Sequence, residues 1–388
     1  MLDHNPARPT TVDPEALIDP RWRRRRVAVA MSGGVDSSVA AVICHLAGCD
    51  VVGVTMKLWE YDSVGGDHIR DGRCCTVEAF DRCRQVAAQF GFPHYLFDFT
   101  EDFERTVICD FLTEYRSGRT PNPCMLCNRA IKWGVLWEKA TQLGCEALVT
   151  GHYAQCHVGA DGDLELRRGA DRTRDQSYFL WRVPPDRLAR TIFPLGGLAK
   201  SDVRALAESW SLPTAETPES RDLCFVEDGD LHRFFDERNT AADRKPLTGA
   251  IVDQNGEHLG HHAGFDRYTI GQRRGLGVAL GRPQYVTAID PETATITVGD
   301  ESELWARTLE TESGHWLATI PESPFHADVQ IRYRHDAAPA VVVDSNREHA
   351  RITFLSPQRA ITPGQSAVIY NGDRVLGGGI IATVSRES

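Results

Sequence analysis

The sequence predicts an α/β fold: a doubly wound parallel sheet, then a small central domain and a C-terminal antiparallel β-barrel. Two sequence patterns, one in each part of the chain, predict this order. Up to about residue 150, short apolar strands alternate with helices long enough to cross over, as in a parallel sheet covered on both faces. From about residue 247, short β-branched runs are broken by turn residues, which is typical of small antiparallel sheets and barrels.

The first part begins with an apolar run over residues 26–31, followed by Ser-Gly-Gly and by helical spacing over residues 35–46. This pattern predicts a strand, a tight loop and a helix. By the same periodicity, the next elements are a strand at 51–56, a helix at 77–90, a strand at 94–99, helices at 102–115 and 130–143, and a strand at 147–150.

The second part contains two strands, 284–289 and 295–298, joined by Asp290-Pro-Glu-Thr, which we interpret as a hairpin. A strand at 249–252 precedes them. The predicted barrel strands are residues 328–334, 340–343, 350–354, 366–370 and 379–384.

The chain has 388 residues, which exceeds one ordinary hydrophobic core and predicts two or three domains. We place boundaries after residues 22, 228 and 299. The expected segments are a loose tail at 1–22, an α/β domain at 23–228, a central domain at 229–299 and a barrel at 300–388.

Composition narrows the class of protein. No apolar run approaches the roughly 18 residues of a membrane helix, and the start of the chain lacks the apolar core of a secretory signal, so we expect a cytoplasmic protein without a membrane partner. The 11 cysteines, none after Cys224, therefore suit reduced, catalytic or metal-binding roles. The net charge of −11 disfavours a passive nucleic-acid coat, although a local basic groove is compatible with it.

The segment Ser32–Ser38, Ser-Gly-Gly-Val-Asp-Ser-Ser, lies where a doubly wound sheet binds ligands, between the first strand and its helix. Its glycines allow close approach to phosphate oxygens, its serines add donors, and the helix N-terminus favours negative charge. Asp36 would repel bare phosphates, so we assign it to a bridging Mg²⁺.

This segment is not a Walker loop, because Gly-Lys-Ser/Thr is absent, and it resembles the PP-loop of the ATP pyrophosphatases. The resemblance implies that ATP is cleaved between its α and β phosphates and that a substrate oxygen is adenylated. It implies that Met56 and Gly151 meet the adenine. The residues that it assigns to pyrophosphate and Mg²⁺ are Ala30, Met31, Ser32, Gly33, Gly34, Val35, Asp36 and Ser37.

A second chemical feature is the pair Cys124 and Cys127, which follows stiffening prolines and precedes a helix predicted from about Asn128. A thiol at a helix N-terminus tends toward the thiolate, which attacks electrophiles and binds soft metals.

Several further segments accompany this pair in order along the chain. They are Thr-Pro-Asn-Pro-x-x-x-Cys-Asn from Thr120, Thr-Gly-His-Tyr from Thr150, Asp-Gln-Ser-Tyr-Phe-Leu from Asp175, Leu-Cys-Phe-Val from Leu223, Tyr-Thr-Ile-Gly-Gln-Arg-Arg-Gly-Leu-Gly from Tyr268, Arg-Tyr-Arg from Arg332 and Thr-Pro-Gly-Gln-Ser-Ala from Thr362. Together they resemble the bacterial tRNA 2-thiouridylases, from about residue 25 to the end. The resemblance implies ATP-dependent 2-thiolation of the wobble uridine and a central domain that binds tRNA.

The resemblance also assigns roles to residues. Cys127 corresponds to the nucleophile and Cys224 to the persulfide carrier, whose sulfur comes from a desulfurase or relay protein. The basic turn Gln272, Arg273 and Arg274 is expected to meet phosphate. The positions that it assigns to the anticodon loop and its uridine, or to other tRNA contacts, are Asn122, Pro123, Cys124, His152, Arg174, Asp175, Gln176, Arg332, Tyr333 and Gln365.

The chain departs from the family pattern at Cys124, where many relatives carry Asp. One hypothesis is that Cys124, Cys127 and Cys224 hold a [4Fe-4S] cluster that delivers inorganic sulfide. The other keeps the persulfide route and makes Cys124 a bystander, and spacing alone leaves both open. Cys74, Cys75 and Cys83 are interpreted as scattered thiols.

Two rival functions use the same loop. Some PP-loop enzymes make amide or amidine bonds on small molecules, but these do not account for the cysteines or the barrel. A non-catalytic iron-sulfur or tRNA-binding module is disfavoured by the intact loop, and release of pyrophosphate would exclude it.

Overall fold

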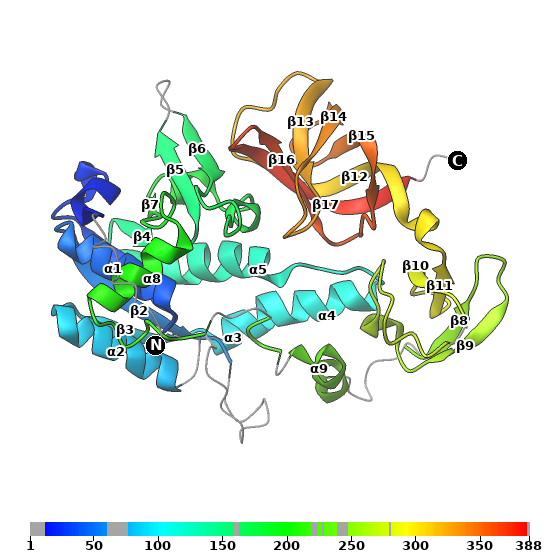
Figure 1. Ribbon diagram of the computed structural model, residues 1–388, viewed down its shortest axis with the longest axis horizontal. Helices are drawn as coiled ribbons and strands as arrows, with labels where there is room; N and C mark the ends of the chain where they lie inside the picture. Colours follow the sequence, from blue (N-terminus) through cyan, green and yellow to red (C-terminus); the bar gives the residue numbers. More distant parts are fainter. Residues whose placement is uncertain are drawn as a thin grey trace, which may run out of the picture. The chain divides into compact units, whose positions relative to one another are not determined.

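The computed structural model describes residues 12–59, 77–158, 163–218, 223–226, 229–238, 247–278 and 281–385. The chain divides into two compact units (Figure 1). The first comprises Met1–Thr106 and Leu126–Phe225, and the second comprises Val107–Met125 and Val226–Ser388. The stretch 107–125, which includes Cys124 at the start of the cysteine pair's helix, thus belongs to the second unit, although we expected it within one α/β domain. The boundaries drawn from the sequence stay predictions.

The first unit is built on a parallel sheet of five described strands in the order β3-β2-β1-β4-β7. Val27 and Val29 belong to the core shared with α1 and α8, whereas the intervening Ala28 is buried outside that core. Alternate residues are thus buried on opposite faces, as a doubly wound sheet requires. The strands are β1 (Arg26–Ala30), β2 (Asp50–Lys57), β3 (His94–Asp98), β4 (Ala147–Val149) and β7 (Thr191–Ile192).

Helices cover this sheet, and α1, α2 and α8 contribute to one hydrophobic core (Figure 1). They are α1 (Val35–Leu46), α2 (Val77–Phe90), α3 (Thr100–Phe103), α6 (Leu136–Gln142), α7 (Pro185–Leu188) and α8 (Lys200–Ser209), with short helical turns η1 (Pro14–Leu17), η2 (Pro20–Trp22) and η6 (Ser177–Phe179) and a hairpin of β5 (Ala154–Val158) and β6 (Leu164–Arg168). None of the helices in the described ranges is long and apolar enough to cross a membrane.

Two predicted helices contain π-helical segments. The helix expected at 102–115 consists of α3, the π-helix η4 (Glu104–Ile108) and α4 (Cys109–Arg116). The helix expected at 130–143 begins earlier, as α5 (Pro123–Leu126) and the π-helix η5 (Cys127–Val135), before α6. Such insertions leave hydrophobic spacing nearly unchanged, so periodicity did not reveal them.

The second unit contains a small mixed sheet and a barrel. The sheet has the order β10-β11-β8-β9, and β10 and β11 form the predicted hairpin. Its own core includes Ile251, Phe265 and Val286. The elements are β8 (Gly249–Val252), β9 (His258–His262), β10 (Tyr285–Asp290) and β11 (Thr295–Gly299), with α9 (Leu231–Arg238), η8 (Phe265–Arg267) and η9 (Glu301–Leu304).

The barrel is antiparallel, runs in the order β12-β15-β14-β13-β16-β17 and closes by pairing β12 with β17. The predicted α/β, central and barrel architecture is therefore confirmed. One strand was placed wrongly: residues 332–334 follow β13 as a turn in which Arg334 has φ +64°. The strands are β12 (Trp305–Trp316), β13 (Phe325–Gln330), β14 (Ala338–Ser345), β15 (Ala350–Arg359), β16 (Ser366–Asn371) and β17 (Arg374–Ser385).

The loop between β15 and β16 holds the segment that leads to the cysteine pair. Thr120 donates its backbone N–H to the carbonyl of Pro363 at 2.9 Å, and its own carbonyl accepts from Gln365 Nε2 at 2.7 Å. Arg119 bridges Glu114 and Glu312 at 2.7 Å each. The backbone before Cys124 is therefore fixed on the barrel.

Gly364 lies at the centre of this contact, and its substitution tests it. Its φ is +91°, and a Cβ there would lie 2.8 Å from the backbone N of Thr120, whereas a Cβ at Gly372, with φ +58°, would meet nothing within 4 Å. We expect Gly372→Ala to lower the unfolding free energy by about 1 kcal/mol and Gly364→Ala by about 3 kcal/mol, because the backbone contact must also open. Urea denaturation of both variants measures this, and equal losses would contradict it.

Candidate functional site

The nucleotide loop lies at the topological switch point of the parallel sheet. The sheet runs outward from β1 to β2 and β3 on one side and to β4 and β7 on the other. Residues 31–34 leave the carboxyl end of β1 and enter α1 at Val35. The crevice at such a point is where open α/β sheets bind their ligands.

The loop is shaped by its own serines and by Gly33. Ser37 Oγ accepts from Ser32 N at 3.1 Å and lies 3.2 Å from both the Gly34 carbonyl and Ser32 Oγ. Gly33 has φ +75°, and a Cβ would lie 2.6 Å from the Ala79 carbonyl oxygen. Gly34 is the N-cap of α1 and supplies no side-chain cap. The first turn of α1 therefore presents its amides at the switch point, where they can bind an anion.

Asp36 carries the carboxylate of this loop, and it is held by two residues that the sequence did not single out. Lys200 Nζ lies 2.7 Å and 2.8 Å from its two carboxylate oxygens, and the Tyr153 hydroxyl donates to Oδ1 at 2.8 Å. The Asp36 side chain remains 33% exposed, compared with 10% for Lys200. One partly exposed carboxylate beside a phosphate loop fits Mg²⁺, which is usually held by one or two carboxylates together with substrate phosphates.

The residues that follow β4 pack against the nucleotide loop. A Cβ at Gly151 would lie 2.8 Å from Asp36 C and Ser37 N, so this position requires glycine. The next residue, His152, contacts Thr150 Oγ1 through Nδ1 at 2.7 Å and Lys132 Nζ through Nε2 at 3.5 Å. Burial, and then the charge of Lys132, lower the pKa of His152 well below its usual value. His152 is therefore a neutral imidazole near physiological pH.

A second histidine supports the strand end that precedes the loop. The Thr55 hydroxyl donates to the Met31 carbonyl at 3.0 Å and lies 2.9 Å from His94 Nε2. Because that hydroxyl has only one proton, His94 Nε2 is the donor to Thr55. Nδ1 of His94 is buried without a hydrogen-bond partner in the described part of the chain, as expected for a neutral ring. Burial, and then the charge of Arg84, lower the pKa of His94 to about 4.

Cys127 begins the π-helix η5, whose residues reach the same edge of the sheet. Asn128 donates through Nδ2 to the Phe179 carbonyl at 3.0 Å, and Trp133 lies 5.8 Å from the His152 ring. Cys124 is exposed in α5, and its backbone N–H is capped by Asn122 Oδ1 at 3.2 Å. Pro123 is buried. The helical segment that follows Cys127 is thus anchored to the segments of Phe179 and His152.

Cys224 is tied to the same helix through aromatic packing. Its neighbour Phe225 packs edge-on against Phe103 of α3, with ring centroids 5.8 Å apart. Helix α3 in turn packs against η5. Both predicted reactive cysteines therefore lie on segments that pack against α3, and their chemical roles stay predictions.

The proposed [4Fe-4S] site receives no support from the structure. Within the described ranges, no group of three His, Cys, Asp or Glu side chains converges as a metal site, although Cys124, Cys127 and Cys224 are all included. The nine described cysteines are unbridged thiols. Cys83 is buried, whereas Cys74 and Cys75 lie outside the described residues.

The predicted tRNA-contact segment is folded around the carboxylate of Asp175. Its Oδ1 accepts from the backbone N–H of Gly169 and Ser177 at 3.0 Å each, and Oδ2 pairs with Arg168 at 2.8 Å. Gln176 Oε1 accepts from Tyr153 N at 3.0 Å. Both side chains thus shape the segment, and Arg174, half-buried beside them, also keeps its tRNA role as a prediction.

The remaining predicted contacts lie in the second unit. Arg332 donates to the Arg359 carbonyl at 3.1 Å, and the Arg334 guanidinium lies 5.8 Å from the Tyr333 ring centroid. Gln365 is engaged with Thr120, as described above. In the basic turn, Gln272 Nε2 donates to the Arg274 carbonyl at 3.0 Å and leaves Arg273 exposed. Binding of tRNA through any of these positions stays a prediction.

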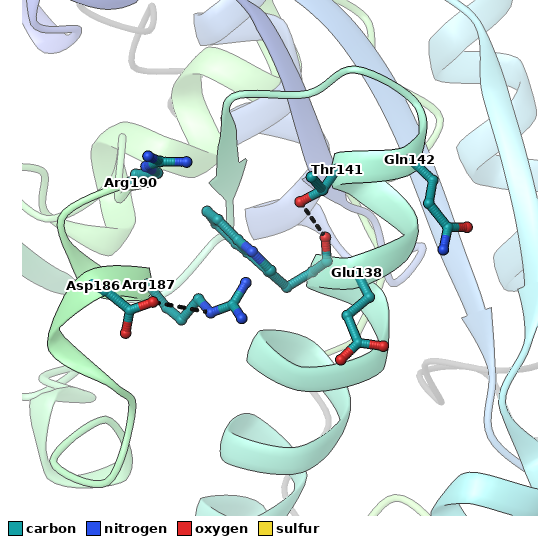
Figure 2. A pocket seen from close by; sticks show the side chains of 7 residues that line it. Glu138, Thr141, Gln142, Asp186, Arg187 and Arg190 are labelled. Carbon is teal, nitrogen blue, oxygen red and sulfur yellow. Dashed lines mark hydrogen bonds and ion pairs between the residues drawn. The ribbon is translucent and has the colours of Figure 1, made fainter.

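A pocket of about 650 Å³ in the first unit is not this site (Figure 2). It lies between α6 and α7 with the following Arg190, and Arg187 of α7 is stacked 4.9 Å from the centroid of the Trp137 ring. Gln142 ends α6 before β4 begins, and Arg190 immediately precedes β7. The pocket therefore lies at the amino ends of these strands, opposite the nucleotide loop.

Comparison with known protein families agrees with this geometry. Residues 25–228 match the model described as a tRNA methyl transferase HUP domain. Residues 241–300 match a tRNA methyl transferase PRC-barrel domain, and residues 306–381 match an aminomethyltransferase beta-barrel domain.

Individual relatives carry a different activity in their names and match nearly the whole chain. The tRNA-specific 2-thiouridylase MnmA of Geobacter metallireducens is 44% identical over 94% of this chain and 98% of its own. The proteins of the same name from Carboxydothermus hydrogenoformans and Salinibacter ruber are 46% and 45% identical, over 92% and 93% of this chain and 98% and 95% of theirs. Because these relatives match nearly the whole chain, they favour the name thiouridylase over the name methyl transferase.

The lowered pKa of His94 predicts acid sensitivity. The folded state holds the ring neutral, so its stabilising contribution is complete above the usual pKa of 6.5 and is lost as the pH falls toward about 4. We expect a loss of about 2 kcal/mol, smaller than the full shift because the ring is partly exposed. Urea denaturation of wild type and His94→Gln at pH 7.5 and 5 measures the difference. An equal pH dependence in both, or the same change in the exposed control His157→Gln, would contradict the prediction.

Proposed function

Because this chain belongs to the tRNA-specific 2-thiouridylase family and is a tRNA sulfurtransferase, we propose that it replaces O2 of the wobble uridine with sulfur at the expense of ATP. The observation that carries the proposal is the presence, in one unit, of the intact Ser32–Ser37 loop and the segments of Cys127 and Cys224. The loop suits activation of an oxygen, and the thiols suit delivery of sulfur. Because the substrate is tRNA, we also propose a cytoplasmic location.

Activation is the first step. Uracil O2 attacks the α-phosphorus of ATP, the bond to the bridging oxygen breaks, and pyrophosphate leaves with both electrons of that bond. The amides of the Gly33–Gly34 turn and the start of α1 bind the departing phosphates. Asp36 would hold Mg²⁺, which when bound offsets phosphate charge. Adenylation is needed because oxide is a poor leaving group, whereas AMP is a good one.

Sulfur transfer is the second step. The terminal sulfur of a Cys224 persulfide attacks C2, and AMP leaves with the former O2. The Cys127 thiolate then attacks Cys224 Sγ, so that the S–S bond breaks and the transferred sulfur stays on C2. That sulfur gains two electrons, and the two cysteines lose two electrons as they form a disulfide. A dithiol reductant must reopen the disulfide before the next turnover.

The environment of Cys127 supports its role as nucleophile. It is half-buried at the start of the π-helical segment η5, one turn after the helix begins at Pro123, so its thiol stays accessible to a substrate. His152 follows the carboxyl end of β4 and contacts Thr150 and Lys132. Because its ring is neutral, it carries no positive charge that would repel the imide N–H of the base. Cys124 lies exposed in the preceding turn and has no step in this route.

The tRNA is proposed to bind through the anticodon loop. The segment of Arg174, Asp175 and Gln176 combines polar edges with the neighbouring aromatic residues Tyr178 and Phe179, a combination suited to an unstacked base. The sulfur donor is proposed to be a persulfide-bearing desulfurase or relay protein, because this route needs only Cys127 and Cys224, which lie in the same unit.

Single-cysteine variants test the sulfur step. We expect Cys127→Ser and Cys224→Ser each to reduce thiolation about 1000-fold or more, while tRNA-dependent pyrophosphate release persists. Cys124→Ser and the exposed control Cys109→Ser should stay within about threefold of wild type. Thiolated tRNA is quantified by mass spectrometry of nucleosides after reaction with a persulfide donor.

The opposite result for Cys124 would restore the cluster hypothesis. If Cys124→Ser abolished thiolation, and protein purified without oxygen lost about four irons per chain in that variant, the enzyme would use an iron-sulfur cluster.

A separate variant tests the nucleotide step. Asp36→Asn should abolish pyrophosphate release while tRNA affinity, measured by filter binding, stays within about twofold, because the carboxylate is assigned to Mg²⁺ and to no tRNA contact. Unchanged pyrophosphate release would refute this assignment.

A further inference from the structure

Tyr153 connects two parts of the first unit, the nucleotide loop and the predicted tRNA-contact segment at residues 169–177. It is 3% exposed and contributes to the hydrophobic core that α1, α2 and α8 share. Its hydroxyl donates to Asp36 Oδ1 at 2.8 Å. Its backbone N–H donates to Gln176 Oε1 at 3.0 Å, and its carbonyl accepts from Gln176 N at 2.9 Å. One buried residue is thus bonded to both parts.

The contacts on the side of the tRNA-contact segment are tight. Gln176 holds both polar groups of the Tyr153 backbone, and a Cβ at Gly169 would lie 2.7 Å from the Tyr153 carbonyl oxygen. The carboxylate of Asp175 accepts from the backbone N–H groups of Gly169 and Ser177, so the two ends of the segment are tied together. Any displacement of the segment is therefore transmitted to the Tyr153 backbone.

On the side of the nucleotide loop, the two oxygens of Asp36 are unequally occupied. Oδ1 accepts from the Tyr153 hydroxyl and from Lys200 Nζ, whereas Oδ2 accepts from Lys200 alone among the described residues. The hydroxyl therefore helps to set the direction of the carboxylate and leaves Oδ2 the more open oxygen. A tyrosine side chain has only two torsions, so a shift of its backbone displaces its hydroxyl. Hydrogen bonds weaken steeply as their angle changes, so the carboxylate must respond to that shift.

We propose that Tyr153 is a positioning residue that couples tRNA binding to the nucleotide site. A base bound at the tRNA-contact segment shifts the Tyr153 backbone, and the hydroxyl thereby sets the orientation in which Asp36 receives the cation of MgATP. The inference rests on the proposed function, because it requires tRNA at the segment and ATP at the loop. The coupling confines pyrophosphate release to protein that holds its tRNA, so ATP is not consumed without a substrate.

Tyr153→Phe removes only the hydroxyl and tests the coupling by binding, without turnover. The probes are an unmodified tRNA transcript with a wobble uridine and the Mg²⁺ complex of α,β-methylene-ATP, which cannot release pyrophosphate. Coupling is reciprocal, so each ligand raises the affinity for the other by the same factor. We expect a factor of about 10 in wild type and of less than about 2 in Tyr153→Phe. Isothermal titration calorimetry of each ligand, with and without the other, measures both factors.

A matched variant and a second measurement control this test. Tyr95→Phe makes the same chemical change at an exposed tyrosine of β3 and should keep the wild-type factor. If Tyr153→Phe does not fold, hydrogen exchange of wild type decides the question. Binding of tRNA without nucleotide should slow amide exchange about threefold or more in peptides that cover residues 32–46, and should leave α6 unchanged. Unchanged exchange at residues 32–46 would contradict the coupling.

The outcomes separate the two proposals. An undiminished coupling factor in Tyr153→Phe, with only a lower melting temperature, would reduce Tyr153 to a structural contact and leave the proposed function intact. The same holds if wild type binds both ligands without coupling. Failure of wild type itself to bind tRNA or the ATP analogue would refute the proposed function.

Discussion

The site depends on one close backbone approach, that of Gly151 to Asp36 and Ser37. The two segments leave the carboxyl ends of adjacent parallel strands, and a Cβ at Gly151 would lie 2.8 Å from the backbone of the loop. Only glycine permits this distance. The approach fixes where the residues after β4 stand, so that the Tyr153 hydroxyl reaches Asp36 of the nucleotide loop. The position of the site is thus set by main-chain packing at the switch point.

Two carboxylates in the first unit show how environment separates structural from chemical roles. Asp175 is 6% exposed at its side chain and is saturated by two backbone amides, an arginine and a hydroxyl. Its removal would leave several buried donors unpaired, which is costly. Asp36 is 33% exposed and is bonded to a lysine and a tyrosine hydroxyl, so part of its carboxylate stays accessible. The second arrangement suits a group that is to bind a cation from solution.

The local sequence pattern was sufficient to predict those parts of the molecule whose structure depends on residues close together in the sequence. The strand, loop and helix of residues 26–46 and the hairpin of β10 and β11 follow from periodicity and turn residues. Lys200 and Tyr153 could not be found in this way, because they lie 164 and 117 positions from Asp36 and nothing near them in sequence marks the contact. Arg334 was placed in a strand because its neighbours alternate, but its φ of +64° belongs to a turn.

The π-helical segments explain another difference between the predicted and the observed structure. The chain passes between the two units after Thr106 and after Met125, within η4 and directly before η5 respectively. A π-turn accommodates an extra residue at the cost of weaker hydrogen-bond geometry, and Gly134 within η5 has φ −103° and ψ −105°, outside the helical range. Cys127 therefore stands where a barrel-held segment enters a helix with loosened bonding. The proposed attack of Cys127 on Cys224 would thus start from a helical segment that is less regular than an α-helix.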